Sequence, residues 1–354
     1  MSLPDISFAH LRGLSDARGL FEHARGTTAR RHLGYCVDDV ARGLVVVSRE
    51  GVELQDLTEV YLKFLVDAQV PDGRFRNRLS LSGHWSDLPG ADLRNADLRS
   101  IAPTTVEDCW GRALWGLGAA VTANSVAGAT GANGATALAA FTKGAFWRSP
   151  YRHSMAFAAL GAAEVLSVLP GHSGARALIA AAAETIGRPR AAHLWPWPED
   201  SLRYANAALP EALIAAGDAL GDESILTDGL MLLDWLLTVE TRDGHLSVTP
   251  VGGRGPGTQA SGFDQQPIEA AAIASACARA FRVTGDHRFA DGVDLAAAWF
   301  LGDNDGGVAL YDAASGGCCD GLQQGGRNEN QGAESTLAAL STLQLARRLP
   351  VMSR

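Results

Sequence analysis

The chain has 354 residues, of which 47% are hydrophobic and 19% charged, so it can bury a large core and wholesale disorder is excluded. Its 39 acidic residues outnumber its 30 basic ones and give a net charge of −9, which argues against nucleic acid as the main partner because phosphate binding needs a basic patch. No apolar run reaches the roughly 18 residues of a membrane span, and the amino terminus lacks the pattern of a signal peptide.

The cysteines are scattered along the chain. Their positions, Cys36, Cys109, Cys277, Cys318 and Cys319, show neither the spacing of a disulfide framework nor that of zinc ligands. With no signal peptide, this usage predicts a cytoplasmic protein with free thiols.

Nearly the whole chain has helical periodicity, and two kinds of predicted helix alternate along it. One kind is amphipathic with a charged face, and it is predicted at 8–24, 54–69, 135–147, 174–186, 225–240 and 287–301. The other is rich in Ala and Gly with polar residues at its start, and it is predicted at 38–48, 107–121, 153–166, 204–220, 264–281 and 330–346. Strand signals are sparse, with short extended pieces predicted at 73–80 and 245–251.

The alternation gives six helix pairs, hence about twelve helices, and a unit of this length along a chain is typical of a repeat architecture. A helix that is apolar on all sides must be buried on all sides. We therefore expect the six Ala- and Gly-rich helices to form an inner barrel that the amphipathic helices cover. The predicted fold is an all-α (α/α)6 barrel in one domain, residues 1–354, with short β pieces in rim loops. An open superhelical solenoid is the structural alternative.

If the pairs alternate in direction, all inner helices start at one end of the barrel and their polar starts converge there. The informative residues at these starts are Asp38, Asp39, Glu107, Asp108, Trp110, Arg112, Tyr151, Arg152, His153, Trp195, Trp197, Glu199, Asp200, Tyr204, Asn206, Phe263, Asp264, Gln265, Gln266, Glu269, Asn330, Gln331 and Glu334. A single acid at a helix start is an ordinary N-cap. Doubled acids flanked by Trp, Tyr, Asn and Gln exceed what capping needs.

Such a set is what a sugar site requires. Carboxylates and amides bind sugar hydroxyls, and aromatic rings stack on the C–H faces of sugars. Cleavage of a glycosidic bond needs one protonated carboxyl and a second carboxylate that activates water or attacks carbon. Acids clustered in one pocket can supply both states, because burial and mutual repulsion raise some of their pKa values.

Other chemistries fit the sequence less well. Motifs of the HExxH, CxxC, GxSxG and P-loop types are absent, so we expect no metal and no cofactor. Two minor alternatives stay open. One is a metal held by Asp38, Asp39 and Asp108. The other is a nucleophile formed by Cys36 or Cys109 with His153.

Six motifs carry a resemblance to a known group of proteins. They are YCVDDVARGL, DGRFRNRLS, VEDCWGRALWGLG, WPEDSLRYANAALPEAL, FDQQPIEAAA and NQGAEST, which span nearly the whole chain from Gly34 to Ala346. They resemble bacterial glycosidase-related or glycosyltransferase-associated proteins of the six-hairpin (α/α)6-barrel glycosidase superfamily. The resemblance implies that acids at the barrel mouth act as general acid and base, here Asp39, Asp108, Asp200 and Asp264. It also implies a functional link to a glycosyltransferase.

The leading hypothesis is an inverting glycoside hydrolase that acts on a short oligosaccharide or glycoconjugate. Asp108 is predicted as the acid and Asp264 as the base. They stand at the starts of the inner helices of the second and fifth pairs, which face each other across a six-fold ring. We expect the other carboxylates, Asp39, Asp200, Glu269 and Glu334, to tune pKa values and bind hydroxyls. The rings expected to stack on sugars are Trp110, Trp197 and Tyr204. The further predicted substrate-binding residues are Asp38, Glu107, Arg112, His153, Glu199, Asn206, Gln265, Gln266 and Gln331.

Two other functions remain open. A sugar epimerase or isomerase could use the same barrel, with His153 as the base, since it is the one histidine at a polar start. A non-catalytic glycan-binding partner of a glycosyltransferase would bind sugar without turnover.

Overall fold

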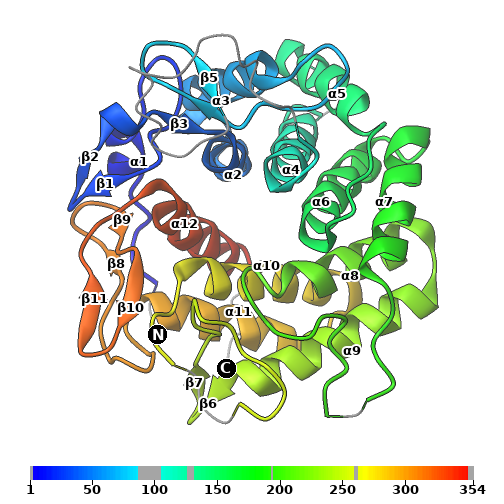
Figure 1. Cartoon of the computed structure of the whole chain (residues 1–354), viewed down its shortest axis with the longest axis vertical. Helices are drawn as coiled ribbons and strands as arrows, with labels where there is room; N and C mark the ends of the chain where they lie inside the picture. Colours follow the sequence, from blue (N-terminus) through cyan, green and yellow to red (C-terminus); the bar gives the residue numbers. More distant parts are fainter. Residues whose placement is uncertain (1–2, 87–104, 126–130, 193, 259–261, 350–354) are drawn as a thin grey trace. The chain divides into compact units, whose positions relative to one another are not determined.

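The computed structural model describes residues 3–86, 105–125, 131–192, 194–258 and 262–349. Over these ranges the chain is mostly helical (Figure 1). The α-helices are α1 Ala9–Gly13, α2 Val37–Ser48, α3 Gln55–Ala68, α4 Asp108–Ala123, α5 Ala132–Gly144, α6 Arg152–Val168, α7 Ser173–Ile186, α8 Ala208–Leu220, α9 Glu223–Glu240, α10 Pro267–Thr284, α11 His287–Phe300 and α12 Ala333–Arg348. Two short 3-10 helices, η1 Arg31–Leu33 and η2 Gly51–Leu54, precede α2 and α3.

The strands of the described residues are only two or three residues long, and they form small antiparallel sheets. One sheet has the order β3-β4-β5, and the pairs β1-β2, β6-β7, β8-β9 and β10-β11 form the others. The strands are β1 Ala24–Arg25, β2 Thr28–Ala29, β3 Tyr35–Cys36, β4 Arg78–Leu79, β5 Trp85–Ser86, β6 Thr241–Arg242, β7 His245–Leu246, β8 Tyr311–Asp312, β9 Gly317–Cys318, β10 Gly321–Gln323 and β11 Gly326–Asn328. The extended pieces predicted at 73–80 and 245–251 contain β4 and β7.

Helices α2 to α12 follow the predicted alternation, but the prediction of a helix over 8–24 is wrong. Only α1 forms there, and it ends at Gly13. The chain then turns back in an antiparallel bridge between Ser15 and Leu20 and pairs Phe21 with Tyr35. The apolar residues of this segment are buried in an irregular chain path, so their helical spacing alone was misleading.

The chain divides into two compact units. The first unit is Leu11–Thr185, and the second unit is Met1–His10 with Ile186–Arg354. A single domain over residues 1–354 stays a prediction.

In the first unit, α4 packs between α2 and α6 (Figure 1). Glycines make this packing close. A Cβ on Gly111 would lie 2.2 Å from the Ser154 carbonyl oxygen, and one on Gly161 would lie 2.2 Å from the Leu114 oxygen. Neighbouring backbones therefore touch, as the Ala- and Gly-rich composition of these helices predicted.

In the second unit, α10 packs against α8, α12 and the amphipathic helix α11. A buried ion pair joins α8 to α10, with Arg279 Nε 3.1 Å from Glu211 Oε1, and Ser275 donates to the same oxygen at 3.1 Å. The unit thus uses polar groups as well as small residues to hold its inner helices together.

None of the helices in the described part of the chain combines the length and the apolar composition needed to cross a membrane.

Candidate functional site

The starts of α2, α4 and α6 lie side by side in the first unit. Asp38 on α2 lies 3.6 Å from Arg112 Nε on α4, and Ser154 Oγ on α6 donates to Asp108 Oδ1 on α4 at 2.6 Å. The expected meeting of polar helix starts is confirmed for these three helices.

The approach of α6 to α4 explains why Asp108 has an oriented carboxylate. Gly111 lies one turn after Asp108 and has no Cβ, so the α6 backbone at Ser154 can come into contact with α4. The Ser154 hydroxyl then reaches Asp108, which remains partly exposed. Asp108 therefore combines access to solvent with a fixed orientation, which a proton-transferring carboxyl needs.

Arg112 is the buried cation of this cluster. It is 3% exposed, and its guanidinium lies 3.8 Å from the centroid of the Phe157 ring on α6. The Asp38 side chain beside it is 18% exposed. The guanidinium thus holds one carboxylate at the edge of the cluster, where a ligand could compete for it.

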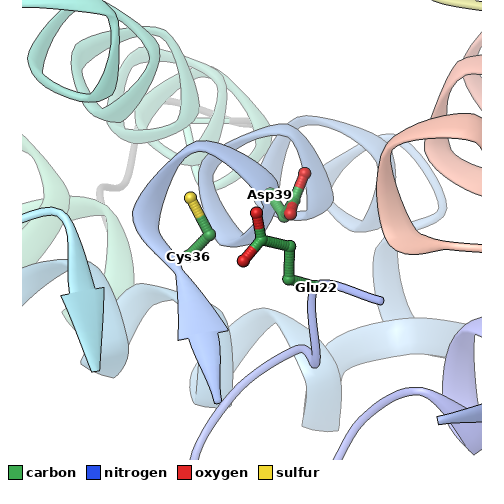
Figure 2. A group of neighbouring side chains, drawn as sticks. All are labelled: Glu22, Cys36 and Asp39. Atoms are coloured by element: carbon green, nitrogen blue, oxygen red, sulfur yellow. The ribbon is translucent and has the colours of Figure 1, made fainter. Parts of the chain in front are cut away.

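Glu22, Cys36 and Asp39 form a second group near the start of α2, and their side chains point toward one another (Figure 2). Their possible ligand atoms all lie within 4.8 Å of one another. Arginines already neutralise both acids, since Arg42 Nη1 lies 2.7 Å from Asp39 and Arg78 pairs with Glu22. A buried carboxylate that is paired in this way is a structural ion pair, so the group does not require a metal to explain it.

The Cys36 thiol is unsuited to nucleophilic chemistry. Burial, together with the charges of Asp38 and Asp39, raises its pKa well above the ordinary value. The nucleophile is the thiolate, and this environment disfavours the thiolate. Cys109 is also buried, on α4. Both observations argue against the Cys–His alternative.

The remaining predicted residues of the first unit differ in exposure. Glu107, the residue before α4, is exposed, and His153 at the start of α6 is partly exposed with its ring 6.4 Å from the Phe157 ring. Trp110 is fully buried and donates its indole N–H to the Gly144 carbonyl oxygen at 3.1 Å. A buried ring has no free face for a sugar, so we do not carry Trp110 into the proposed function.

In the second unit, Asp264 and Asp200 are both exposed. The Asp264 carbonyl oxygen accepts the Val251 N–H at 2.8 Å, which fixes the backbone of this residue and leaves the carboxylate at the surface. The Asp200 side chain is 95% exposed and pairs with Arg190 at 2.9 Å. Asp200 therefore forms an ion pair that is open to solvent, which argues against its predicted catalytic role.

Glu269 and Asn206 are buried and bonded to each other. The Glu269 carboxylate accepts the Asn206 N–H at 3.2 Å, the Asn206 side-chain amide at 2.9 Å and the Ala205 N–H. Ala205 has a φ of 45°, so α8 starts at Ala208, after the predicted position. These contacts occupy both side chains within the fold, which argues against their predicted contacts with sugar.

Glu240, the last residue of α9, is a second buried carboxyl near Glu269. Burial raises the pKa of both groups, and the charge of Glu240 raises that of Glu269 further. The Thr249 hydroxyl donates to Glu240 Oε1, while Oε2 has no hydrogen-bond partner among the described residues. Both are therefore buried carboxyls with raised pKa values, and only Glu269 stands at a predicted polar start.

A polar network that the sequence did not predict joins three segments of the second unit. Asp305 accepts hydrogen bonds from Gln265 Nε2 at 2.6 Å and Ser247 Oγ at 2.5 Å, and its other oxygen lies 3.0 Å from His245 Nε2. The Trp299 indole N–H lies 3.3 Å from Gln265 Oε1. Gln265 is thus fully occupied in the fold, whereas His245 and Asp305 are the residues that the polar-start pattern missed.

The other predicted residues of the second unit fall into two groups. Trp197 is fully buried and stacks on Trp235 at 5.8 Å, and Gln331 is buried between Ser315 and Asp312. Their burial argues against direct sugar contact. The partly exposed members, which stay available for substrate binding, are Glu199, Tyr204, Gln266 and Glu334.

No family model matches the sequence, and no curated protein matches it. Solved structures do match over nearly the whole chain. Cellobiose 2-epimerase from Bacillus thermoamylovorans has a TM-score of 0.67 at 10% identity, covering 97% of this chain and 96% of its own. A D-mannose isomerase has a TM-score of 0.63 at 11% identity, covering 94% of both chains. A GH76 α-mannanase from Bacteroides thetaiotaomicron has a TM-score of 0.64 at 11% identity, covering 96% and 92%.

Identities this low show the fold alone. The helix order and short sheets described above agree with those matches. The chain therefore has the six-hairpin (α/α)6-barrel fold that these carbohydrate-active proteins share.

Proposed function

We propose that the protein is a carbohydrate-active enzyme, and more specifically an inverting glycoside hydrolase that acts on a short oligosaccharide. The observation that carries the proposal is the group at the starts of α2, α4 and α6. There a partly exposed, oriented Asp108 lies on the same helix as Arg112, which pairs with Asp38 on α2. Such a group offers a fixed carboxyl for proton transfer and charged side chains for sugar hydroxyls.

In the proposed reaction Asp108 donates its proton to the glycosidic oxygen as the C–O bond to the anomeric carbon breaks. Asp264 takes a proton from the water whose oxygen forms the new bond to that carbon. The exposed carboxylate of Asp264 gives water free access to it. Asp39 contributes through its ion pair with Arg42, as a charge near the site.

The side chains proposed for hydroxyl recognition are those that stay partly exposed or exposed at the predicted polar starts. In the first unit they are Asp38, Glu107 and His153, and in the second unit they are Glu199, Tyr204, Gln266 and Glu334. Arg112 is buried and acts through its pair with Asp38. The Tyr204 ring is the remaining stacking candidate, because both predicted tryptophans are buried.

A sugar epimerase or isomerase is the second candidate. The favouring observation is His153, which is partly exposed and precedes Ser154, the partner of Asp108. A histidine there could take a proton from the carbon beside a sugar carbonyl. Two of the matching structures described above are an epimerase and an isomerase. The cytoplasmic location and the link to a glycosyltransferase remain predictions.

The test is to incubate the purified chain with cellobiose, maltose, mannobiose and mannose and to follow the products by proton NMR. Asp108→Asn and Asp264→Asn should each lower hydrolysis by about a hundredfold or more, since general acid–base catalysis contributes about 10²–10⁴ in rate. Asp67→Asn on α3 and Asp234→Asn on α9 are matched controls, because both replace exposed, ion-paired aspartates on amphipathic helices.

The first product signal also separates the candidates. Inverted anomeric configuration supports the proposed hydrolase. A new epimer or ketose without cleavage, abolished by His153→Gln, would replace it with the second candidate. Sugar binding without turnover in the unmodified chain would identify a glycan-binding partner instead. Full activity in both Asp→Asn variants would contradict the assignment of the two carboxylates.

A further inference from the structure

His245 and Asp305 form a histidine–carboxylate pair in the second unit, outside every predicted polar start. His245 begins β7, and Asp305 lies in the segment between α11 and β8, 60 residues further along the chain. Nε2 of the ring lies 3.0 Å from Asp305 Oδ1. The two side chains are 18% and 15% exposed, so the pair lies just below the surface.

The Asp305 carboxylate is held in one orientation. Its second oxygen accepts from both Ser247 Oγ and Gln265 Nε2. The preceding residue, Asn304, donates to the Trp299 and Val308 carbonyl oxygens at 2.7 and 2.9 Å, which fixes the turn. Although burial opposes ionisation, the hydrogen bonds from Ser247, His245 and Gln265 lower the Asp305 pKa. The acceptor facing His245 is therefore a fixed anion.

This anion selects the tautomer of His245. An ionised carboxylate has no proton to give, so Nε2 must carry the hydrogen and donate it. In the neutral ring Nδ1 then has no hydrogen and is an acceptor only. In the described part of the chain no residue hydrogen-bonds to Nδ1. The pair thus presents one oriented acceptor to a molecule that can donate a hydrogen bond.

The pair is connected to the segment that carries Asp264. Gln265 bonds directly to Asp305, and Val251, in the segment that follows β7, donates its N–H to the Asp264 carbonyl oxygen at 2.8 Å. Pro250 and Gln265 form an antiparallel bridge in the same place. The segments that carry His245, Asp305 and Asp264 are therefore joined by hydrogen bonds within the second unit.

We propose that His245 is a subsite residue that accepts a hydrogen bond from one hydroxyl of the bound sugar through Nδ1, with Asp305 as its positioning residue. This inference rests on the proposed function, since it assigns a sugar contact to the part of the second unit that carries Asp264, the proposed base. Sugars are rich in hydroxyl donors, and a fixed acceptor discriminates between sugars that differ in the orientation of one hydroxyl.

Two substitutions at the same position separate the roles of the two ring nitrogens. His245→Gln places an amide N–H near the position of Nε2, so it keeps the bond to Asp305 and loses the Nδ1 acceptor. His245→Asn places an amide oxygen near the position of Nδ1, so it keeps the acceptor and loses the bond to Asp305. Urea unfolding of both variants shows whether the fold is retained.

Binding is measured by calorimetry with whichever of cellobiose, maltose, mannobiose and mannose the unmodified chain binds, and with the monodeoxy analogues of that sugar. His245→Gln should weaken binding about three- to tenfold, the loss of one hydrogen bond. His245→Asn should lose less. One deoxy analogue should bind the unmodified chain more weakly than the parent sugar does. The same analogue should bind His245→Gln as tightly as the parent sugar binds that variant, because the acceptor is already missing.

The outcomes distinguish the subsite from the function on which it rests. If the unmodified chain binds none of the sugars, the proposed function fails and the subsite fails with it. If the chain binds a sugar but His245→Gln binds it equally tightly, the subsite alone is overturned. The subsite is also overturned if each deoxy analogue loses the same affinity, relative to the parent sugar, in the unmodified chain and in His245→Gln. The effect of His245 would then be structural.

Discussion

The two units use polar residues at their inner-helix starts in opposite ways. In the first unit, Asp108 and Asp38 stay partly exposed and are oriented by a hydroxyl and a guanidinium from neighbouring helices. In the second, Glu269 and Gln265 are buried, and their hydrogen bonds hold loops against helices. Polar residues at helix starts therefore include accessible ones, such as Asp108 and Asp38, and buried ones that hold the fold together, such as Glu269 and Gln265, and burial distinguishes the two kinds.

The largest expected effect tests the scaffold role of Glu269. Glu269→Ala leaves the N–H groups of Ala205 and Asn206 without an acceptor in a buried place. A buried donor that has lost its acceptor costs about 1–3 kcal/mol, so the free energy of unfolding should fall by about 3–5 kcal/mol. Urea unfolding monitored by circular dichroism measures it.

The matched substitution in the first unit is Asp108→Ala. It removes an acceptor for a single hydroxyl at a partly exposed position, and it should cost about 1 kcal/mol. Equal losses in the two variants would remove the distinction between site and scaffold.

A second variant tests the backbone contact that orients Asp108. In Gly111→Ala the new Cβ would lie 2.2 Å from the Ser154 carbonyl oxygen, so α4 and α6 must separate. Overpacking of this kind typically costs about 1–3 kcal/mol. Gly13→Ala in α1 is the control, since its Cβ would meet nothing within 4 Å. A thermal unfolding series that shows the same midpoint for both variants would mean that the α4–α6 contact is looser than described.

The alternation of helices was predictable from the sequence, because Ala and Gly without charge leave a helix no side that can face water. The partners of the polar residues were not. His245 and Asp305 lie 60 residues apart in the chain, and neither has a spacing that indicates the other. Trp110 and Tyr204 look alike in the sequence, each following an acid near a helix start, but only the packing shows that Trp110 donates to Gly144. Composition predicts that a residue is polar or aromatic, and tertiary structure decides whether it faces a ligand.

The pH dependence of stability tests the buried carboxyls of the second unit. Burial raises the pKa of Glu240 from 4.5 to about 7, and burial with the charge of Glu240 raises that of Glu269 to about 8. The folded state then binds protons that the unfolded state releases, so stability is complete below about pH 4.5 and falls as pH rises toward about 8.

Glu240→Gln is the variant that isolates this effect. The amide cannot ionise, so the slope of unfolding free energy between about pH 5 and 8 should be shallower than in the unmodified chain. Asp305 and Asp312 have lowered pKa values, and their contribution changes only at more acidic pH. A slope of opposite sign in the unmodified chain would mean that the two carboxyls are ionised in the fold.

The smallest expected effect concerns Asp200, a predicted catalytic residue. Its side chain is 95% exposed and pairs with Arg190, and exposed pairs contribute about 0–1 kcal/mol. Asp200→Asn should therefore change the unfolding free energy by less than about 1 kcal/mol and the turnover of any hydrolysed sugar by less than about twofold. A larger loss of turnover with unchanged stability would restore Asp200 to the reaction.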